Sequence, residues 1–320
     1  MTDSRSKRRW MDTHVHVSSM GAEGTKREHL LEGLLDVLDR CDADLRWVIS
    51  PDNVELIRIC KEAEGVYEGS RFIFDLVRRS EGRLYGSCMV NPHFLDESLR
   101  TMEVCFEKWG FVQLGEMVQY IMDYQMDSPP VERLVRKAAE YGVPVHVHIS
   151  SSWPREGMVS TYGMQHLRDL LALAERVPEA RYILAHAISE VDDNPPVVDQ
   201  YLDTMEARFG RWPENFWIEI RDADSPGIRS ALARVPSTRI MMGTDWVSRV
   251  GPPFLPYGVI FLVPLEESRY EPSVSAMVKL LRRAGASEDV IDQIGFKNAE
   301  ALLLGRGRCD AHCTLGQVNR

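Results

Sequence analysis

The feature that most constrains the fold of this 320-residue chain is a regular alternation of short β-rich runs with longer amphipathic stretches. Most of the runs are bounded by Gly, Pro or Asn turn signals. Eight runs predict strands, at 9–17, 44–50, 83–91, 111–117, 143–150, 181–187, 215–221 and 239–246. Helical patterns lie at 28–40, 53–64, 97–108, 130–141, 163–176, 197–208, 226–234, 273–284 and 287–304. This alternation predicts parallel βαβ units, and the strand count favours a closed (β/α)8 TIM barrel over a doubly wound open sheet.

The pattern predicts a single domain. We expect the barrel to span 9–304, after a lead-in at 1–8 and before a tail at 305–320. One long segment, 247–271, is rich in Pro and large apolar residues and follows the eighth run. It should therefore rise from the active face of the barrel, where loops of this length are usually functional. A packed loop, a lid and an oligomer contact all stay open for it.

Composition excludes several classes of protein. A net charge of −10 argues against nucleic acid or an anionic membrane as the main partner. The chain has no apolar run long enough to predict a transmembrane helix, and no secretory signal follows the basic run at 7–9. Four of the six cysteines are scattered through predicted strands and helices, as reduced thiols are, so we expect a cytoplasmic protein. Cys309, His312 and Cys313 cluster in the tail, but a zinc site normally needs four ligands, so a frayed tail is favoured.

Five of the nine histidines lie in predicted strands, and several of them stand near the carboxyl end of a run. Residues i and i+2 of a strand share a face, so His14 projects with His16, and His146 projects with His148. The barrel interior is favoured for them, because imidazoles would be poorly satisfied in the apolar helix layer. Barrel enzymes carry their active sites at the carboxyl ends of the strands. Six side chains are expected to meet there: His14, His16, Glu116, His148, His186 and Asp245.

Each of these residues is weak evidence alone. A lone histidine in a strand is usually a core residue, and an Asp after Gly-Thr is often a helix N-cap. Six candidate ligands on five strand ends are much harder to explain in that way. Imidazoles and carboxylates together suit Zn²⁺, Mn²⁺ or Fe²⁺. The set therefore predicts a metal site, in which Asp245 is a ligand, a general base or both.

Five motifs in this order resemble the amidohydrolase superfamily, and most closely its amidohydrolase-2 branch, over roughly residues 10–304. They are MDTHVH at 11–16, VPVHVH at 143–148, ILAH at 183–186, MGTDW at 242–246 and FKNAEALL at 296–303. The resemblance implies a metal held by His14, His16, His148 and Asp245, with His186 as a ligand or a catalytic neighbour. The expected ion is zinc, with manganese or iron as alternatives.

The number of metals stays open. Members of the superfamily with two metals need a bridging group, often a carbamylated lysine or a glutamate on the fourth strand. The predicted fourth strand has no lysine but carries Glu116, in a Gly-Glu setting similar to that of the TatD-like nucleases. Glu116 therefore either bridges two metals or contacts only the substrate or a neighbouring group. His146 departs from the usual pattern, and we expect it one layer deeper, where it orients a ligand.

Two reactions suit such a site. The first expectation is hydrolysis of an amide, lactone or ester by metal-activated water, with Asp245 as the general base. The alternative is non-oxidative decarboxylation, or hydration, of an aromatic or unsaturated carboxylic acid, as is common in the amidohydrolase-2 branch. A decarboxylase needs a cationic clamp for the carboxylate. Arg221, at the end of the seventh run, is the best candidate, and Arg155 is the second. A salt bridge with Asp222 or Asp224 is an equally good explanation of Arg221.

Aromatic residues are expected to line the substrate pocket. They are Tyr120, Trp153 and Trp246. A third possibility is a barrel that binds a metal or ligand without turnover, which the intact ligand set disfavours. We expect a small-molecule substrate, no nucleic-acid or membrane partner, and a homodimer.

Overall fold

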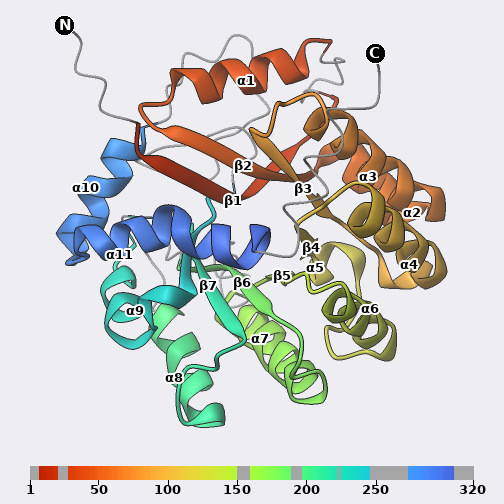
Figure 1. Cartoon of the computed structure of the whole chain (residues 1–320). Helices are drawn as coiled ribbons and strands as arrows, with labels where there is room; N and C mark the ends of the chain where they lie inside the picture. The colour runs from red at the N-terminus through yellow and green to blue at the C-terminus, as the bar shows by residue number, and fades with distance from the viewer. Residues whose placement is uncertain are drawn as a thin grey trace, which may run out of the picture.

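The eight predicted strands form one parallel sheet whose strands follow one another in chain order. The computed structural model describes residues 7–20, 28–149, 159–188, 197–221, 223, 225–245 and 273–305. The strands are β1 (Arg9–Val17), β2 (Asp44–Pro51), β3 (Leu84–Cys88), β4 (Gln113–Met117), β5 (Val145–His148), β6 (Tyr182–Ile188), β7 (Phe216–Ile220) and β8 (Ile240–Met242). They curve into a nearly closed barrel with the helices outside, which confirms the predicted TIM barrel (Figure 1).

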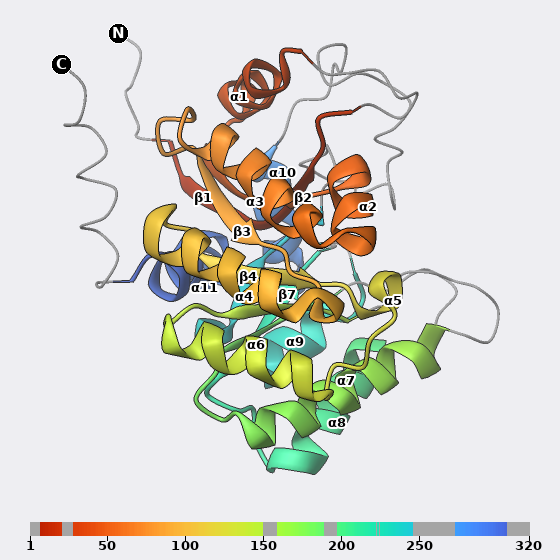
Figure 2. The same cartoon turned by 90° about the vertical axis from the view of Figure 1, so that its right-hand side faces the viewer.

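Helices cover the outer face of the sheet, and Figure 2 shows α2, α3, α4 and α6 following one another along one side. The helices are α1 (Leu30–Arg40), α2 (Asn53–Lys61), α3 (Ala63–Val77), α4 (Leu95–Glu103), α5 (Gln119–Met122), α6 (Pro129–Glu140), α7 (Val159–Arg176), α8 (Val197–Phe209), α9 (Ile228–Arg234), α10 (Val274–Ala284) and α11 (Glu288–Asp292). Wider helical turns at Gln293–Lys297 and Glu300–Leu304 continue α11. No helix in this described part of the chain has both the length and the apolar character needed to span a membrane.

The predicted helix at 53–64 is confirmed as α2, which ends at Lys61, but α3, the second helix that follows β2, was not predicted from the sequence. The chain is extended at Glu62, where α2 ends and α3 begins. Two glycines in α3 lower its helix propensity, so the sequence pattern does not predict this helix. They also let α3 pack closely on α2: a Cβ atom at Gly69 would lie 2.8 Å from Ile59 Cδ1, and one at Gly65 would overlap the backbone of Arg58. The close packing of α3 on α2 therefore outweighs the low helix propensity of its two glycines.

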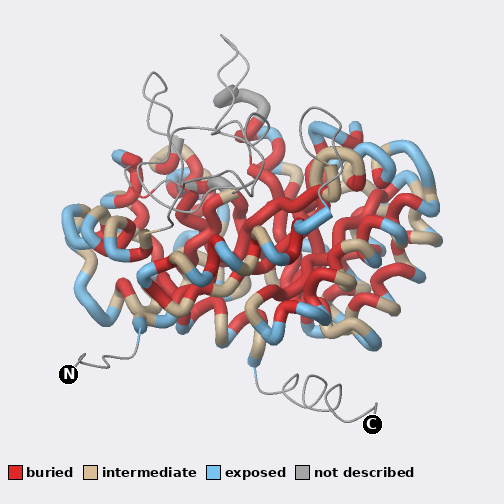
Figure 3. The backbone as a smooth tube through the Cα atoms, turned by 90° about the horizontal axis from the view of Figure 1, so that it is seen from above, coloured by how far each residue is buried: buried red, intermediate tan, exposed pale blue. Residues whose placement is uncertain are grey.

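Side chains in the barrel interior form layers. The layer at the amino ends of the strands is apolar, and the turns after α11 cover it with Phe296 and Leu302. Its residues from the strands are Met11, Val48, Tyr85, Ile183, Trp217 and Met241, joined by Val112 directly before β4. A separate, larger core lies between the strands and the helices. Buried segments run through the middle of the molecule and exposed segments lie at its periphery (Figure 3). The layers nearer the carboxyl ends of the strands are polar, and they form the candidate site.

Side chains join the two end strands of the sheet. Thr13 Oγ1 of β1 donates a hydrogen bond to the carbonyl oxygen of Met242 in β8, at 2.8 Å. The backbone N–H of Thr244 donates to Asp12 Oδ1, at 2.9 Å. The pairing of β1 with β2 also shifts register between Asp12 and Val15, which marks a bulge. The shift falls at Thr13 and His14, so the first of the two histidines lies within the bulge and His16 lies just after it.

Candidate metal centre

Four side chains bring one donor atom each to a single point in the mouth of the barrel. They are His14 and His16 of β1, Glu116 of β4, and Asp245, three residues beyond β8. The Nε2 atoms of His14 and His16 are 3.0 Å apart. Glu116 Oε2 lies 3.2 Å and 3.3 Å from these two nitrogens, and Asp245 Oδ1 lies 3.6 Å and 3.3 Å from them. The two histidines project together, as the spacing in the strand predicts.

The donor atoms fit one divalent ion. A tetrahedral site with ligand bonds of about 2.1 Å has donor atoms about 3.4 Å apart, close to the separations in this cluster. Two imidazole nitrogens and two carboxylate oxygens suit Zn²⁺, Mn²⁺ or Fe²⁺. The carboxylates supply the negative charge that offsets the cation. Glu116 and both histidines are buried, so little solvent competes for these donors.

His148 lies at the edge of this cluster. Its Nδ1 atom is 2.7 Å from Oε1 of Glu116, whereas the contacts of Glu116 with the β1 histidines are made by Oε2. Glu116 thus connects His148 to the centre. Burial would raise the pKa of Glu116, but His14 and His148 outweigh burial and hold that pKa well below its ordinary value. Glu116 is therefore ionised and available to a cation.

The hydrogen bonds of the β1 histidines leave their Nε2 atoms directed at the centre. Nδ1 of His16 lies 2.9 Å from Ser50 Oγ at the end of β2. Nδ1 of His14 lies 2.9 Å from Glu219 Oε2 in β7. A ring whose Nδ1 is bound in this way presents Nε2 to a metal.

Electrostatics in the cluster favour positive charge. Burial by itself would lower the pKa of His14, but Glu219 and Glu116 outweigh it and hold that pKa well above its ordinary value. Burial also opposes the charge on His16, yet hydrogen bonds with Asp245 and Glu116 raise its pKa to about 10. The same negative field attracts a divalent cation. Protons and a metal ion therefore compete for these two rings.

Arg221 and Tyr120 flank the centre. Arg221 follows β7 directly, its side chain is buried, and its Nε atom lies 3.5 Å from Asp245 Oδ2. Tyr120, in α5, is 47% exposed, and its ring lies against His148 with centroids 4.5 Å apart. Arg221 thus places a cation beside Asp245, and Tyr120 places an aromatic surface beside His148.

Several predicted residues fall outside what the structure describes. They are the side chain of His186 and the residues Trp153, Arg155, Asp222, Asp224, Trp246, 247–271, Cys309, His312 and Cys313. Their predicted roles stay predictions.

Sequence reasoning missed Glu219. It is fully buried in β7, and its carboxylate contacts His14, His146 and Thr13. The signal was its register: in FWIEIR, Glu219 is in phase with Arg221, so both side chains point inward. His146 lies in this deeper layer, with its Nε2 atom 3.2 Å from Glu219 Oε2.

Comparison with protein families gives one match. Residues 61–304 match the family model Amidohydro_2, which is described as amidohydrolase. The match begins after β2, so the two histidines of β1 lie outside it. No curated protein sequence matches the chain.

Solved structures share the fold. A Staphylococcus aureus protein described as an amidohydrolase superposes with a TM-score of 0.64 at 13% identity, covering 92% of this chain and 99% of that chain. A dihydroxybenzoic acid decarboxylase from Polaromonas, solved with bound manganese and an inhibitor, has a TM-score of 0.60 at 14% identity, with coverages of 94% and 98%. The 4-oxalomesaconate hydratase from Rhodopseudomonas palustris has a TM-score of 0.61 at 13% identity, with coverages of 97% and 100%. At these identities the likeness concerns the barrel itself.

Proposed function

Because this chain belongs to the amidohydrolase family, we propose that it is a divalent-metal-dependent enzyme that decarboxylates a small aromatic or unsaturated carboxylic acid without oxidation. The observation that carries this proposal is Arg221, a buried guanidinium beside the candidate metal centre. Two proteins of the same fold are a decarboxylase and a hydratase, which supports lyase chemistry over hydrolysis.

Arg221 is the proposed clamp for the substrate carboxylate. Its Nε atom faces Asp245, and a guanidinium carries five N–H donors in a fixed fork. A carboxylate bound through the two terminal nitrogens therefore leaves the contact with Asp245 in place. The buried setting strengthens such a pair, because little water screens it.

A divalent cation held by His14, His16, Glu116 and Asp245 would stabilise the negative charge that develops on the substrate as its carbon–carbon bond breaks. Decarboxylation leaves the electron pair on the substrate carbon, releases CO₂ and requires a proton at that carbon. Asp245 stands between the centre and Arg221, so we assign it the role of holding this proton. Tyr120 offers an exposed ring for a planar substrate.

Hydrolysis is the second candidate, and the position of Asp245 supports it. One of its carboxylate oxygens lies 3.3 Å from His16 Nε2 and so borders the centre. In this reaction a water molecule attacks an amide, lactone or ester, and Asp245 takes the proton from that water. Arg221 has no necessary part in such a reaction, which separates the two candidates.

The test is turnover by protein that has been stripped with a chelator and reloaded with Mn²⁺ or Zn²⁺. We expect CO₂ release from hydroxybenzoic or unsaturated acids, and none from metal-free protein. Turnover of a lactone and amide panel without CO₂ release would establish hydrolysis instead. Protein that binds neither ion, and gains no activity with either, would contradict both candidates.

A further inference from the structure

The proposed reaction does not use Glu219, a fully buried carboxylate that contacts the candidate centre. Glu219 lies one layer below Arg221 on β7, and its side chain has no exposed surface. Its Oε2 atom is 2.9 Å from His14 Nδ1 and 3.2 Å from His146 Nε2. Its Oε1 atom accepts a hydrogen bond from Thr13 Oγ1, at 2.9 Å. Three donors thus converge on one carboxylate.

These contacts decide the tautomer of His14. An ionised carboxylate only accepts hydrogen bonds, so the ring nitrogen that faces it must carry the hydrogen. With its hydrogen on Nδ1, a neutral imidazole has its lone pair on Nε2, the atom that lies among the four donors. We infer that Glu219 is a positioning residue that fixes His14 in the tautomer and orientation a divalent ion requires. This inference rests on the proposed function only in that the centre binds such an ion.

The surrounding chain holds Glu219 in place. The hydroxyl of Thr13 lies 2.9 Å from Glu219 Oε1 and 2.8 Å from the carbonyl oxygen of Met242, and its one hydrogen is shared between these two acceptors, so Glu219 lies beside both β1 and β8. Gly243 of the same segment leaves the space that the carboxylate occupies, because a Cβ atom there would overlap it. His146 supplies a further donor from β5.

A second cation among His14, His146 and Glu219 is the competing interpretation, since their donor atoms lie within 4.8 Å of one another. It would require both nitrogens of His14 to act as ligands, and therefore a ring without either hydrogen. The hydrogen bond from Thr13 already occupies the other oxygen of Glu219. A positioning role explains all three contacts with an ordinary imidazole.

The test is the dissociation constant for Mn²⁺, measured by calorimetry on metal-free protein, beside the melting temperature of that protein. Glu219→Leu removes the acceptor at similar volume and should weaken Mn²⁺ binding about 10- to 100-fold. Glu219→Gln keeps one acceptor oxygen and should recover part of the loss. Gly243→Ala displaces the carboxylate without removing a polar group and should weaken binding as Glu219→Leu does. These variants keep the inference testable if Glu219→Leu does not fold.

Thr13→Val and Thr101→Val form a matched pair. Both threonines are fully buried, but Thr13 holds Glu219, whereas the Thr101 hydroxyl has no hydrogen-bond partner among the described residues. Thr13→Val should weaken Mn²⁺ binding several-fold, towards the lower end of the range for such neighbours of a ligand. Thr101→Val should leave it unchanged.

A spectroscopic measurement separates positioning from general loss of structure. In zinc-loaded protein labelled with ¹⁵N-histidine, His14 should show a hydrogen on Nδ1, and this signal should change in Glu219→Leu but not in Thr101→Val. Folded Glu219→Leu that binds Mn²⁺ as the wild type does would overturn the inference and leave the proposed function intact. If the wild type bound a second ion, and both Glu219→Leu and His146→Gln lost that ion, the two-cation interpretation would replace the positioning role. Failure of the proposed function is recognised earlier, in a wild-type protein that binds no metal.

Discussion

The two ends of the barrel both gather charged side chains, but in opposite surroundings. At the mouth, the Glu116 and Glu219 side chains are 3% and 0% exposed, and both contact His14. At the other end, Arg8 and Glu288 form an ion pair of 2.7 Å with side chains that are 31% and 54% exposed. Buried charges carry a large desolvation cost, whereas exposed pairs contribute little to stability. The mouth therefore holds charges that stability alone does not require.

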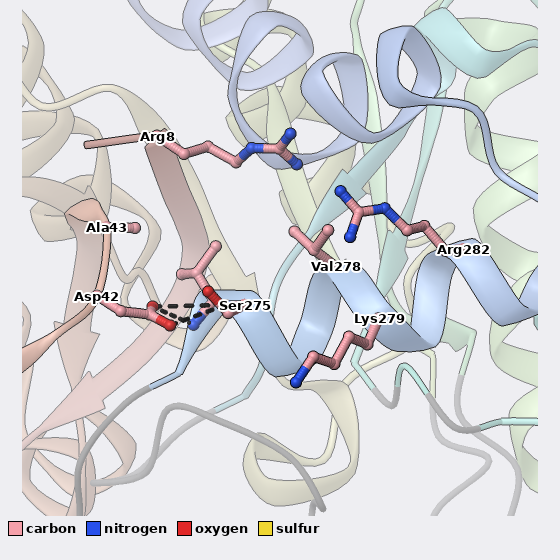
Figure 4. Close-up of a pocket in the computed structure, with 8 residues that line it drawn as sticks. Arg8, Asp42, Ala43, Ser275, Val278, Lys279 and Arg282 are labelled. Carbon is pink, nitrogen blue, oxygen red and sulfur yellow. Dashed lines mark hydrogen bonds between the residues drawn. The ribbon is translucent and has the colours of Figure 1, made fainter. Parts of the chain in front are cut away.

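The end of the barrel away from the mouth has a pocket of about 280 Å³ (Figure 4), and several of its charged residues pair with other residues of the chain. It is lined by Arg8, Asp42, Ala43, Val274, Ser275, Val278, Lys279 and Arg282. Arg8 and Arg282 both contact Glu288, and Asp42 accepts hydrogen bonds from the first backbone N–H groups of α10. These charges meet partners within the chain and hold α10 and α11 against β1. Charge at this end holds elements of the fold together, whereas we propose that charge at the mouth binds a ligand.

The largest expected effect is at Asp245, which borders both the centre and Arg221. Asp245→Asn keeps the shape but removes the charge and the proton-holding group, so kcat should fall about 10³-fold. Steady-state kinetics on the Mn²⁺-loaded protein measures this, with Asp42→Asn as the matched change at the other end of the barrel. A loss of less than tenfold at Asp245 would show that it has no part in proton transfer.

Arg221→Ala should have the next largest effect. Removing the clamp should lower kcat/KM for a carboxylic acid about 10²-fold, as expected for a buried charged hydrogen bond. Arg221→Lys keeps the charge without the fork and should recover only part of the loss. Arg46→Ala is a suitable control, because Arg46 pairs with Asp44 at the amino end of β2. Equal turnover of the acid by Arg221→Ala and wild type would remove the main support for decarboxylation.

As the pH rises, the stability of the metal-free protein should fall, whereas its affinity for Mn²⁺ should rise. His16, whose pKa is raised to about 10, holds a proton more tightly in the folded protein than at its ordinary value of 6.5. Its contribution to the stability of the metal-free protein is full below pH 6.5 and is lost as the pH rises through about 10. Metal must displace this proton, so Mn²⁺ binding should tighten up to tenfold per pH unit over the same range. Calorimetry in buffers of different ionisation enthalpy counts the protons released. Binding that is independent of pH would contradict the assignment of His16 as a ligand.

The sequence predicted the parts of the site that depend on strand geometry alone. His14 and His16 share a face because side chains alternate along a strand, and the carboxyl ends of parallel strands meet at one mouth. That reasoning also brought in Glu116 and Asp245, which no local motif connects. It needed only the register within each strand and the direction of the strands.

Contacts across the barrel could not be predicted in the same way. His14 lies within the register shift of β1, and its Nδ1 atom faces Glu219 across the barrel; neither feature can be read from the spacing of residues. Glu219 lies one layer below the rim, between two isoleucines, so a search of strand ends passes over it. Helix α3 was missed for a related reason. Its glycines lower the local helix propensity, and the close packing that they allow becomes visible only in the structure.

A smaller effect, on stability only, is expected from Asp42→Ala at the amino end of α10. Burial opposes the charge on Asp42, but hydrogen bonds from Ser275 and Val274 outweigh it and lower its pKa below 3.8. Removing these hydrogen bonds should cost about 1 kcal/mol of unfolding free energy. Because the folded pKa is depressed, the difference between wild type and variant should shrink as the pH falls below about 4. Urea unfolding measures both effects, and Mn²⁺ affinity should not change. A loss of Mn²⁺ affinity would show that the two ends of the barrel are coupled.

The smallest effect is expected for the ion pair of Arg9 and Glu300, and it separates charge from packing at the same end. The two side chains are 50% and 43% exposed and meet at 2.7 Å, so Glu300→Gln should change the unfolding free energy by less than about 0.5 kcal/mol. The guanidinium of Arg9 also lies over the ring of Phe296, 3.7 Å from its centroid. The aliphatic part of Arg9 can therefore cover the apolar layer to which Phe296 belongs. Arg9→Ala should therefore cost more than Glu300→Gln, by about 0.5–1 kcal/mol, and added salt should abolish the Glu300 effect but leave the part of the Arg9 effect that comes from packing. Equal effects of the two changes, both abolished by salt, would mean that Arg9 acts through its charge alone.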